Sequence, residues 1–191
     1  MLFRSIVNHC WGSYIQGAAA GNSTRGIFDY GYYLGLGANV KIRKKVTYAC
    51  QGTTTGTCAS IEHRFPSAAG NATRGIFALG SVSCSSNQST TRNKYTYACD
   101  SNTSGTAATN ASQRGSATGN ATRGIFALGL VCSVASTTRN KYTYACDANA
   151  SGAAASAVGA MGSATGNDTR GIFAIGACGN STTKVRDKYT Y

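Results

Sequence analysis

The sequence predicts an all-β protein built from four repeats, and three observations support this fold class. The motif Thr-Arg-Gly-Ile-Phe occurs four times, and its arginines, Arg25, Arg74, Arg123 and Arg170, are spaced 49, 49 and 47 residues apart. A period of ~20–50 residues is typical of solenoids, propellers and other arrays of one supersecondary unit. No segment shows a sustained apolar period of about 3.6 residues, so we expect no helix longer than about two turns.

Each unit contains two strong strand signals. The first is the apolar run Gly75-Ile-Phe-Ala-Leu-Gly80, repeated at 124–129 and 171–176, which predicts a strand buried on both faces. A Gly-Asn turn signal precedes each copy. The second is Lys94-Tyr-Thr-Tyr-Ala-Cys99, in which alternation predicts a strand with one apolar face. Weaker signals between these runs raise the expectation to about four short antiparallel strands per unit.

The expected core follows from these runs. Both faces of the apolar strand should be covered, and the tyrosines of the second strand should pack beside it. The residues expected in the core are Ile76, Phe77, Leu79, Ile125, Phe126 and Leu128, together with Tyr97 and Tyr144.

The composition is that of a chain with mostly small apolar side chains. Of the 191 residues, 42% are hydrophobic, but there are 24 Gly, one Trp and six Phe, so large side chains are scarce. Small residues suit sheets that pack closely face to face. The 18 Lys and Arg against six Asp and Glu give a formal charge of +12, which predicts attraction to polyanions. The alternative is that this charge only keeps the chain in solution.

The chain is expected to be a single repeat domain over residues 1–191, with units at roughly 17–65, 66–114, 115–161 and 162–191. The last unit is short, and the 22 residues from Arg170 to Tyr191 complement the 24 that precede Arg25. We therefore expect residues 1–16 to complete the fourth unit. Such completion closes a ring, either within one chain or between the two chains of a homodimer.

The unit resembles the blade of a kelch-type β-propeller. The apolar strand 75–80 ends in Gly, as the kelch strand ends in a glycine pair, and the Tyr-containing strand 94–100 follows a variable loop. The resemblance covers nearly the whole chain, but Ser81 replaces the second glycine and the late Trp of the kelch pattern has no counterpart. It implies four-stranded sheets arranged radially around a channel. The unit is also similar to repeats of about 48 residues in bacterial and phage proteins.

Basic residues recur at two places in every unit. One set begins the apolar strand and the other begins the neighbouring antiparallel strand, so the two sets should point to opposite rims. We predict that these rims bind a ligand; the alternative is that the Thr-Arg-Gly arginines cap backbone carbonyls between units. The candidate binding residues are Arg25, Arg74, Arg123, Arg170, Arg92, Lys94, Arg139, Lys141, Arg186 and Lys188.

Neither a catalytic nor a metal or cofactor site is expected. His9 and His63 are the only histidines and do not recur, and the six carboxylates form no paired arrangement. The eight cysteines contain no Cys-x-x-Cys motif, and we interpret them as small buried hydrophobic residues between sheets. The Asn-x-Ser/Thr sequons are interpreted as chance products of a Ser-, Thr- and Asn-rich repeat, with glycosylation as the alternative.

These observations predict a non-enzymatic binding or assembly module whose basic rims contact an anionic glycan or a protein partner, with nucleic acid as a further polyanion. One alternative is a structural repeat of a phage or cell-surface fibre. Another, implied by the kelch resemblance, is a copper-dependent sugar oxidase, against which the shortage of histidine argues because copper favours imidazole ligands. No apolar run approaches the ~20 residues of a membrane span, residues 1–7 make a poor signal peptide, and the localisation stays open.

Overall fold

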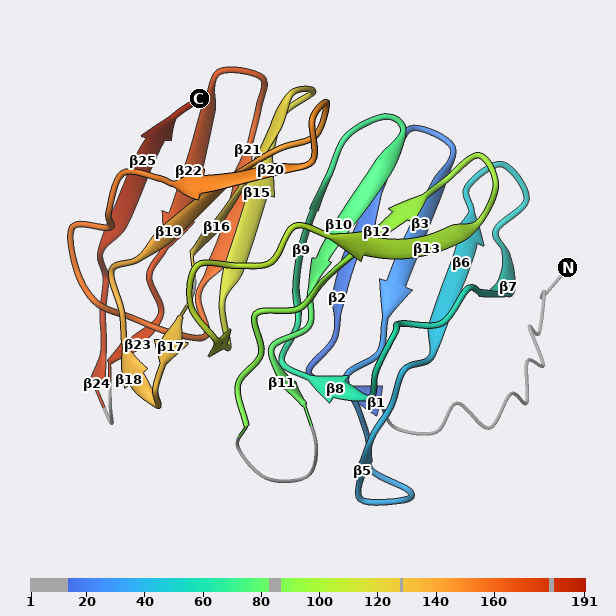
Figure 1. Ribbon diagram of the computed structural model, residues 1–191, viewed down its shortest axis with the longest axis horizontal. Helices are drawn as coiled ribbons and strands as arrows, with labels where there is room; N and C mark the ends of the chain where they lie inside the picture. The colour runs from blue at the N-terminus through green and yellow to red at the C-terminus, as the bar shows by residue number, and fades with distance from the viewer. Residues whose placement is uncertain (1–13, 83–86, 128, 179–180) are drawn as a thin grey trace, which may run out of the picture.

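The computed structural model describes residues 14–82, 87–127, 129–178 and 181–191, and in these residues the fold is all-β with no helix, as predicted. One antiparallel sheet from each repeat unit stands face to face with the next, and the sheets form a row in sequence order (Figure 1). The row runs from the blue sheet of unit 1 at one end to the red sheet of unit 4 at the other. Shorter strands lie along one edge of the row.

Each main sheet places the Thr-Arg-Gly strand beside the basic strand that leads into the tyrosines. Unit 1 contributes β2 (Ala18–Gly21), β3 (Arg25–Asp29), β6 (Arg43–Thr47) and β7 (Gly52–Gly56). Unit 2 contributes β9 (Ser67–Gly70), β10 (Arg74–Ala78), β12 (Arg92–Thr96) and β13 (Ser101–Gly105). Unit 3 contributes β15 (Ser116–Gly119), β16 (Arg123–Ala127), β19 (Arg139–Thr143) and β20 (Ala148–Ser151). Unit 4 contributes β21 (Ser163–Gly166), β22 (Arg170–Ala174) and β25 (Arg186–Thr190).

The remaining strands are two residues long and form small sheets of their own. The first joins β1 (Tyr14–Ile15), β4 (Tyr32–Tyr33) and β5 (Ala38–Asn39), and the second joins β8 (His63–Arg64) and β11 (Ser81–Val82). The third joins β14 (Ser112–Gln113), β17 (Leu130–Val131) and β18 (Val134–Ala135), and the fourth joins β23 (Ala177–Cys178) and β24 (Ser181–Thr182).

An asparagine side chain fixes the turn before each Thr-Arg-Gly strand. In unit 2, Asn71 Oδ1 accepts hydrogen bonds of 3.0 Å from the backbone N–H groups of Thr73 and Arg74. Asn71 Nδ2 donates a 3.0 Å hydrogen bond to the carbonyl oxygen of Ala121 in unit 3. The Gly-Asn signal therefore closes the hairpin, as Asn does in many turns, and also ties neighbouring units together.

Alternation along the central strands gives each sheet two different faces. In β10, Phe77 points to the preceding unit and Ile76 to the following unit. The isoleucine of one unit therefore packs against the phenylalanine and tyrosines of the next. The three resulting clusters centre on Ile27 with Phe77, Tyr95 and Tyr97; on Ile76 with Phe126, Tyr142 and Tyr144; and on Ile125 with Phe173 and Tyr189.

The predicted core residues are buried wherever their side chains are described. Ile76, Phe77, Leu79, Ile125 and Phe126 are 0% exposed, and the two tyrosines, Tyr97 and Tyr144, are 2% exposed. Leu128, which was also predicted to be buried, lies outside the described residues.

The glycine of Thr-Arg-Gly lets neighbouring sheets approach each other. A Cβ atom added at Gly75 would lie 2.9 Å from the Tyr97 hydroxyl and 3.0 Å from the Cβ of Ala20 in unit 1. Gly124 repeats this arrangement with Tyr144 and Ala69. The separation from the hydroxyl is shorter than real Cβ contacts and the one from the alanine is tighter than most of them, so glycine fits best between the tyrosine and the adjoining sheet.

Closure of a ring within one chain is not observed among the described residues. Strand β1 pairs with β4 in unit 1, and the main sheets of units 1 and 4 stand at opposite ends of the row (Figure 1). Of residues 1–16, which were expected to complete unit 4, residues 1–13 lie outside the described part of the chain. None of the described segments forms a helix long and apolar enough to cross a membrane.

The interpretation of the cysteines as buried residues is wrong for the five whose side chains are described. Cys50, Cys58, Cys99, Cys132 and Cys146 are free and exposed. Strand β12 ends at Thr96 and the chain then turns, so the alternation that buries Tyr95 and Tyr97 does not extend to Cys99. The side chains of Cys10, Cys84 and Cys178 lie outside the description.

Burial of the tyrosines predicts that the fold loses stability at alkaline pH. Burial raises the pKa of Tyr97 and Tyr144 above the ordinary value of about 10. Their contribution is therefore fully present below pH ~10, and is lost as the pH rises further because the unfolded phenols ionise first. Burial also lowers the pKa of Arg92 to about 10, so this group adds stability as the pH rises above that value. Its effect opposes that of the two tyrosines, but it comes from one group and not from two.

We expect alkaline unfolding, followed by tyrosinate absorbance and circular dichroism together, to begin near pH 10. The variant Tyr144→Phe should make stability less sensitive to pH in this range. An unchanged pH dependence in that variant would show that Tyr144 does not hold its proton through burial.

Candidate functional site

A buried arginine braces each inner pair of neighbouring sheets. Arg43, Arg92 and Arg139 begin the equivalent strands β6, β12 and β19, and they are 0%, 1% and 3% exposed. The guanidinium carbons lie 4.5, 4.7 and 4.6 Å from the ring centroids of Phe77, Phe126 and Phe173 in the following unit. These are cation–π contacts in a desolvated setting, where such contacts are strongest.

The same guanidinium groups donate hydrogen bonds to a side-chain oxygen opposite the phenylalanine. Arg92 Nη2 donates to Asn140 Oδ1 at 3.0 Å, and Arg92 Nη1 donates to Asn149 Oδ1 at 2.8 Å. In unit 4 the partner is a carboxylate, since Arg139 Nη2 lies 2.8 Å from Asp187 Oδ2. Burial alone would raise the pKa of Asp187, but hydrogen bonds from Ser156 and the Arg139 charge together hold it below its usual value.

The lysines two residues after the first two braces make a second contact with the following unit. Lys45 is paired with Asp100, and Lys94 is paired with Asp147. The ammonium and carboxylate groups are partly exposed, so each ion pair contributes little to stability, although it does orient the two units.

The arginines of Thr-Arg-Gly cap backbone carbonyls in the following unit wherever a hydrogen bond is described. Arg25 Nη1 donates to the carbonyl oxygen of Tyr97 at 2.8 Å, and Arg74 Nη1 donates to that of Tyr144 at 3.1 Å. Capping of backbone carbonyls between units was the alternative to ligand binding for these arginines. Arg123 is half-buried, and Arg170 is exposed. Arg74 also lines a shallow groove between units 2 and 3, beside Asn71, Thr122, Thr143 and Tyr144.

The two basic sets lie at opposite ends of the strands, as predicted, but not all of them lie on an accessible rim. In the pairing of β10 with β12, Arg74 is opposite Thr96 and Arg92 is opposite Ala78. Accessibility was wrongly predicted for Arg92 and Arg139, because their side chains turn between the sheets. The missed signal lies in units 2 to 4, where Asn93, Asn140 and Asp187 follow the arginine directly. In each of these strands an oxygen acceptor therefore lies on the face opposite the arginine and toward the preceding unit.

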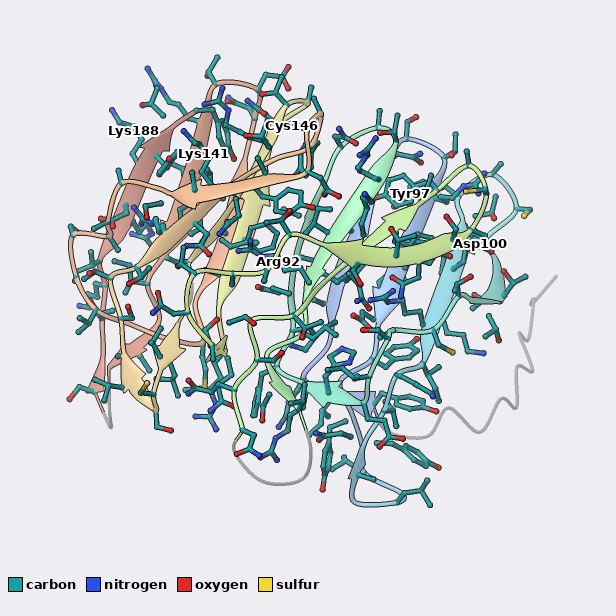
Figure 2. All side chains as sticks on the ribbon, viewed as in Figure 1. Arg92, Tyr97, Asp100, Lys141, Cys146 and Lys188 are labelled. Carbon is teal, nitrogen blue, oxygen red and sulfur yellow. The ribbon has the colours of Figure 1, made fainter. Side chains whose placement is uncertain are left out.

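The exposed positive charge gathers on unit 4. Among the described basic residues, only Lys41 is exposed in units 1 to 3, whereas Arg170, Lys184, Arg186 and Lys188 are all exposed in unit 4. Figure 2 shows Lys188 at this end of the row and Arg92 inside it. Arg170, Ile172, Arg186 and Lys188 occupy alternate positions of β22 and β25, and we call them the outer face of unit 4. In units 1 to 3, the residues at the same strand positions face the sheet of the next unit.

A buried charged cluster is specific to unit 1. Asp29 Oδ2 lies 3.2 Å from both Arg43 Nη2 and His63 Nε2, and all three side chains are 0% exposed. Ala78 and Ala127 occupy the position of Asp29 in the next two units. The cluster is sealed from solvent, so it has the character of a structural ion pair and not of a substrate site.

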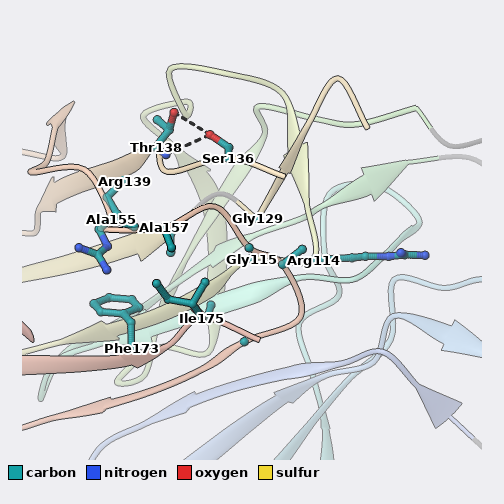
Figure 3. A pocket seen from close by; sticks show the side chains of 15 residues that line it. Arg114, Gly115, Gly129, Ser136, Thr138, Arg139, Ala155, Ala157, Phe173 and Ile175 are labelled. Atoms are coloured by element: carbon teal, nitrogen blue, oxygen red, sulfur yellow. Dashed lines mark hydrogen bonds between the residues drawn. The ribbon is translucent and has the colours of Figure 1, made fainter. Parts of the chain in front are cut away.

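The cavity in Figure 3 lies between units 3 and 4, with the Arg139 guanidinium over the Phe173 ring. Small residues such as Gly129, Ala155 and Ala157 form most of its lining. Apart from Arg114 and Arg139 it brings no titratable side chain together. Nowhere in the described chain do three or more His, Cys, Asp or Glu residues come together as a metal site.

Comparison with known proteins assigns no family to this chain: no family model matches it, and no curated protein is significantly similar to it.

Proposed function

We propose that this protein is a non-enzymatic binding and assembly module, in which the stacked sheets are the scaffold and the outer face of unit 4 is the contact surface for an anionic partner. The single observation that carries the proposal is the distribution of exposed charge. Inside the row, the three equivalent arginines and two of the three equivalent lysines contact the next unit, whereas Arg186 and Lys188 are exposed. Cations at an exposed face attract anionic groups of a glycan, a nucleic acid or a protein.

The finer form of the proposal, a closed kelch-like propeller, requires residues 1–16 to meet unit 4. We favour an open row, because Tyr14 and Ile15 pair with β4 at the opposite end. A structural repeat of a phage or surface fibre is the second candidate, and the face-to-face stacking of equivalent units favours it. We do not favour the oxidase, since His63 is buried beside Asp29 and is not presented to a metal together with Tyr and Cys.

Binding to heparin and to a DNA oligonucleotide at two salt concentrations tests the proposal. The variant Arg186→Glu/Lys188→Glu should bind at least about tenfold more weakly than the wild type, and the wild-type affinity should fall as salt rises. The single variants Arg186→Glu and Lys41→Glu are the matched pair, because each reverses one exposed charge but Lys41 lies in unit 1. Equal losses in both variants would mean that net charge, and not the outer face, governs binding.

A further inference from the structure

The outer face of unit 4 repeats the residues with which each inner sheet contacts its follower, yet no sheet covers it in the described chain. We infer that this face docks onto a β-sheet of a partner protein that presents an aromatic ring beside carboxylate or amide oxygens. The inference rests on the proposed function, because it uses the same contact surface and specifies the partner's chemistry. The interfaces between the units inside the chain supply the evidence for it.

Each inner interface has a donor side and an acceptor side. The donor side carries the isoleucine of the Thr-Arg-Gly-Ile strand, the arginine brace and the lysine two residues later. The acceptor side carries a phenylalanine, a tyrosine, and Asn or Asp side chains that accept from the brace and, at the first two interfaces, from the lysine. At the interface of units 2 and 3, these acceptor residues are Phe126, Asn140, Tyr142 and Asp147.

Unit 4 keeps the complete donor side. Ile172, Arg186 and Lys188 correspond to Ile76, Arg92 and Lys94 in unit 2. Ile172 is 37% exposed, whereas Ile27, Ile76 and Ile125 are each 0% exposed under the following unit. An apolar residue ringed by cations is suited to a partner that supplies both an apolar ring and anionic or amide oxygens.

A second copy of this chain does not supply the acceptor side. The free face of unit 1 keeps the ring of Phe28, which is 40% exposed, and that of Tyr48, which is 50% exposed. Lys44, Val46 and Gln51, however, stand where unit 2 has Asn93, Tyr95 and Asp100. In head-to-tail stacking Lys44 would meet the Arg186 guanidinium, and like charges at an interface act against that pairing. The outer face of unit 4 therefore suits a different protein better than a second copy of this chain.

A full-length probe with a restored acceptor side tests this inference directly. The probe carries Lys44→Asn, Val46→Tyr and Gln51→Asp on unit 1, and Ile172→Asp with Arg186→Glu on unit 4, so that it can accept but not donate. The control protein carries only the two unit 4 changes. Sedimentation velocity of the wild type mixed with each protein measures docking, and far-UV circular dichroism and thermal melting check folding.

We expect a one-to-one complex of the wild type with the probe, but none with the control and none in the wild type alone. Replacing Ile172 by Asp in the wild-type partner should weaken this complex at least about tenfold, as hot-spot substitutions do. If the probe does not fold, the milder Lys44→Asn/Gln51→Asp version with the same unit 4 changes replaces it. A folded probe of either kind that fails to bind overturns the inference, and so does self-association of the wild type through Phe28.

The failure of the two proposals can be distinguished. Wild-type protein with Ile172→Thr retains every cation of the outer face, so it should bind heparin normally and the probe weakly. If heparin binds and the folded probe does not, sheet docking is wrong while the anionic contact surface stands. If the probe binds and no polyanion does, the face is a protein interface alone, and the broader proposal fails for glycans and nucleic acids.

Discussion

Replacing Phe126 by alanine is expected to lower the free energy of unfolding by about 3–5 kcal/mol, the range for removing a large buried side chain from a core. Phe126 is 0% exposed, packs against Ile76 of the preceding unit and carries the Arg92 guanidinium on its ring. A cavity at this position removes packing contacts from the sheets of both unit 2 and unit 3. Chemical denaturation monitored by circular dichroism measures the loss.

The chain supplies a matched control for this change. Phe28 occupies the same position in unit 1 but is 40% exposed on the free face of the row, so Phe28→Ala should cost no more than about 1 kcal/mol. Lys141→Ala, at a half-buried lysine, should cost no more than about 0.5 kcal/mol, as surface changes usually do. If Phe126→Ala were no more destabilising than Phe28→Ala, the sheets would not be stacked as described.

Replacing Arg92 by alanine should cost about 2–4 kcal/mol, although arginine is usually a surface residue. The change removes the cation–π contact with Phe126 and leaves the Asn140 and Asn149 oxygens without their charged donor in a buried layer. Lost hydrogen bonds to a charged group each cost about 1.5–3 kcal/mol, and Asn140 Oδ1 limits the loss because it still accepts from the Thr109 N–H. Urea denaturation of the variant measures the loss.

Arg186→Ala is the matched control for the brace, because the same strand position is exposed in unit 4; it should change stability by no more than about 0.5 kcal/mol. Arg92→Lys should recover little of the loss, since a lysine ammonium cannot bind two amide oxygens in the planar arrangement that a guanidinium uses. Full recovery with lysine would mean that charge alone matters at this position.

The strands and the core could be predicted because the same sequence signals for them occur in several repeats. Gly75 to Gly80 and Gly124 to Gly129 are identical, so a strand signal in one unit supports the other, and the runs of Ile and Phe mark both faces as buried. The rule that alternation defines a face also placed Tyr97 correctly. It failed at Cys99, because the strand ends at Thr96 and the chain turns.

The relation between units could not be predicted in the same way. A period near 48 residues is compatible with blades around a channel and with sheets stacked in a row, and the sequence does not state the angle between successive sheets. The burial of Arg92 and Arg139 was missed for a related reason. A basic residue at the start of a strand is usually exposed, but an aromatic ring and a side-chain oxygen opposite it can bury it. Here the ring and the oxygen belong to the next unit, about fifty residues away in the sequence.

Hydrogen exchange of the arginine guanidinium protons, followed by nuclear magnetic resonance of the side-chain N–H groups, tests the stacked row and its open end most directly. Arg43, Arg92 and Arg139 are buried braces and should exchange slowly, whereas Arg186 is exposed and should exchange as fast as an arginine in a short peptide. Equal protection of all four would contradict the account by showing that another sheet covers unit 4, as in a closed ring. Fast exchange of all four would contradict the bracing itself.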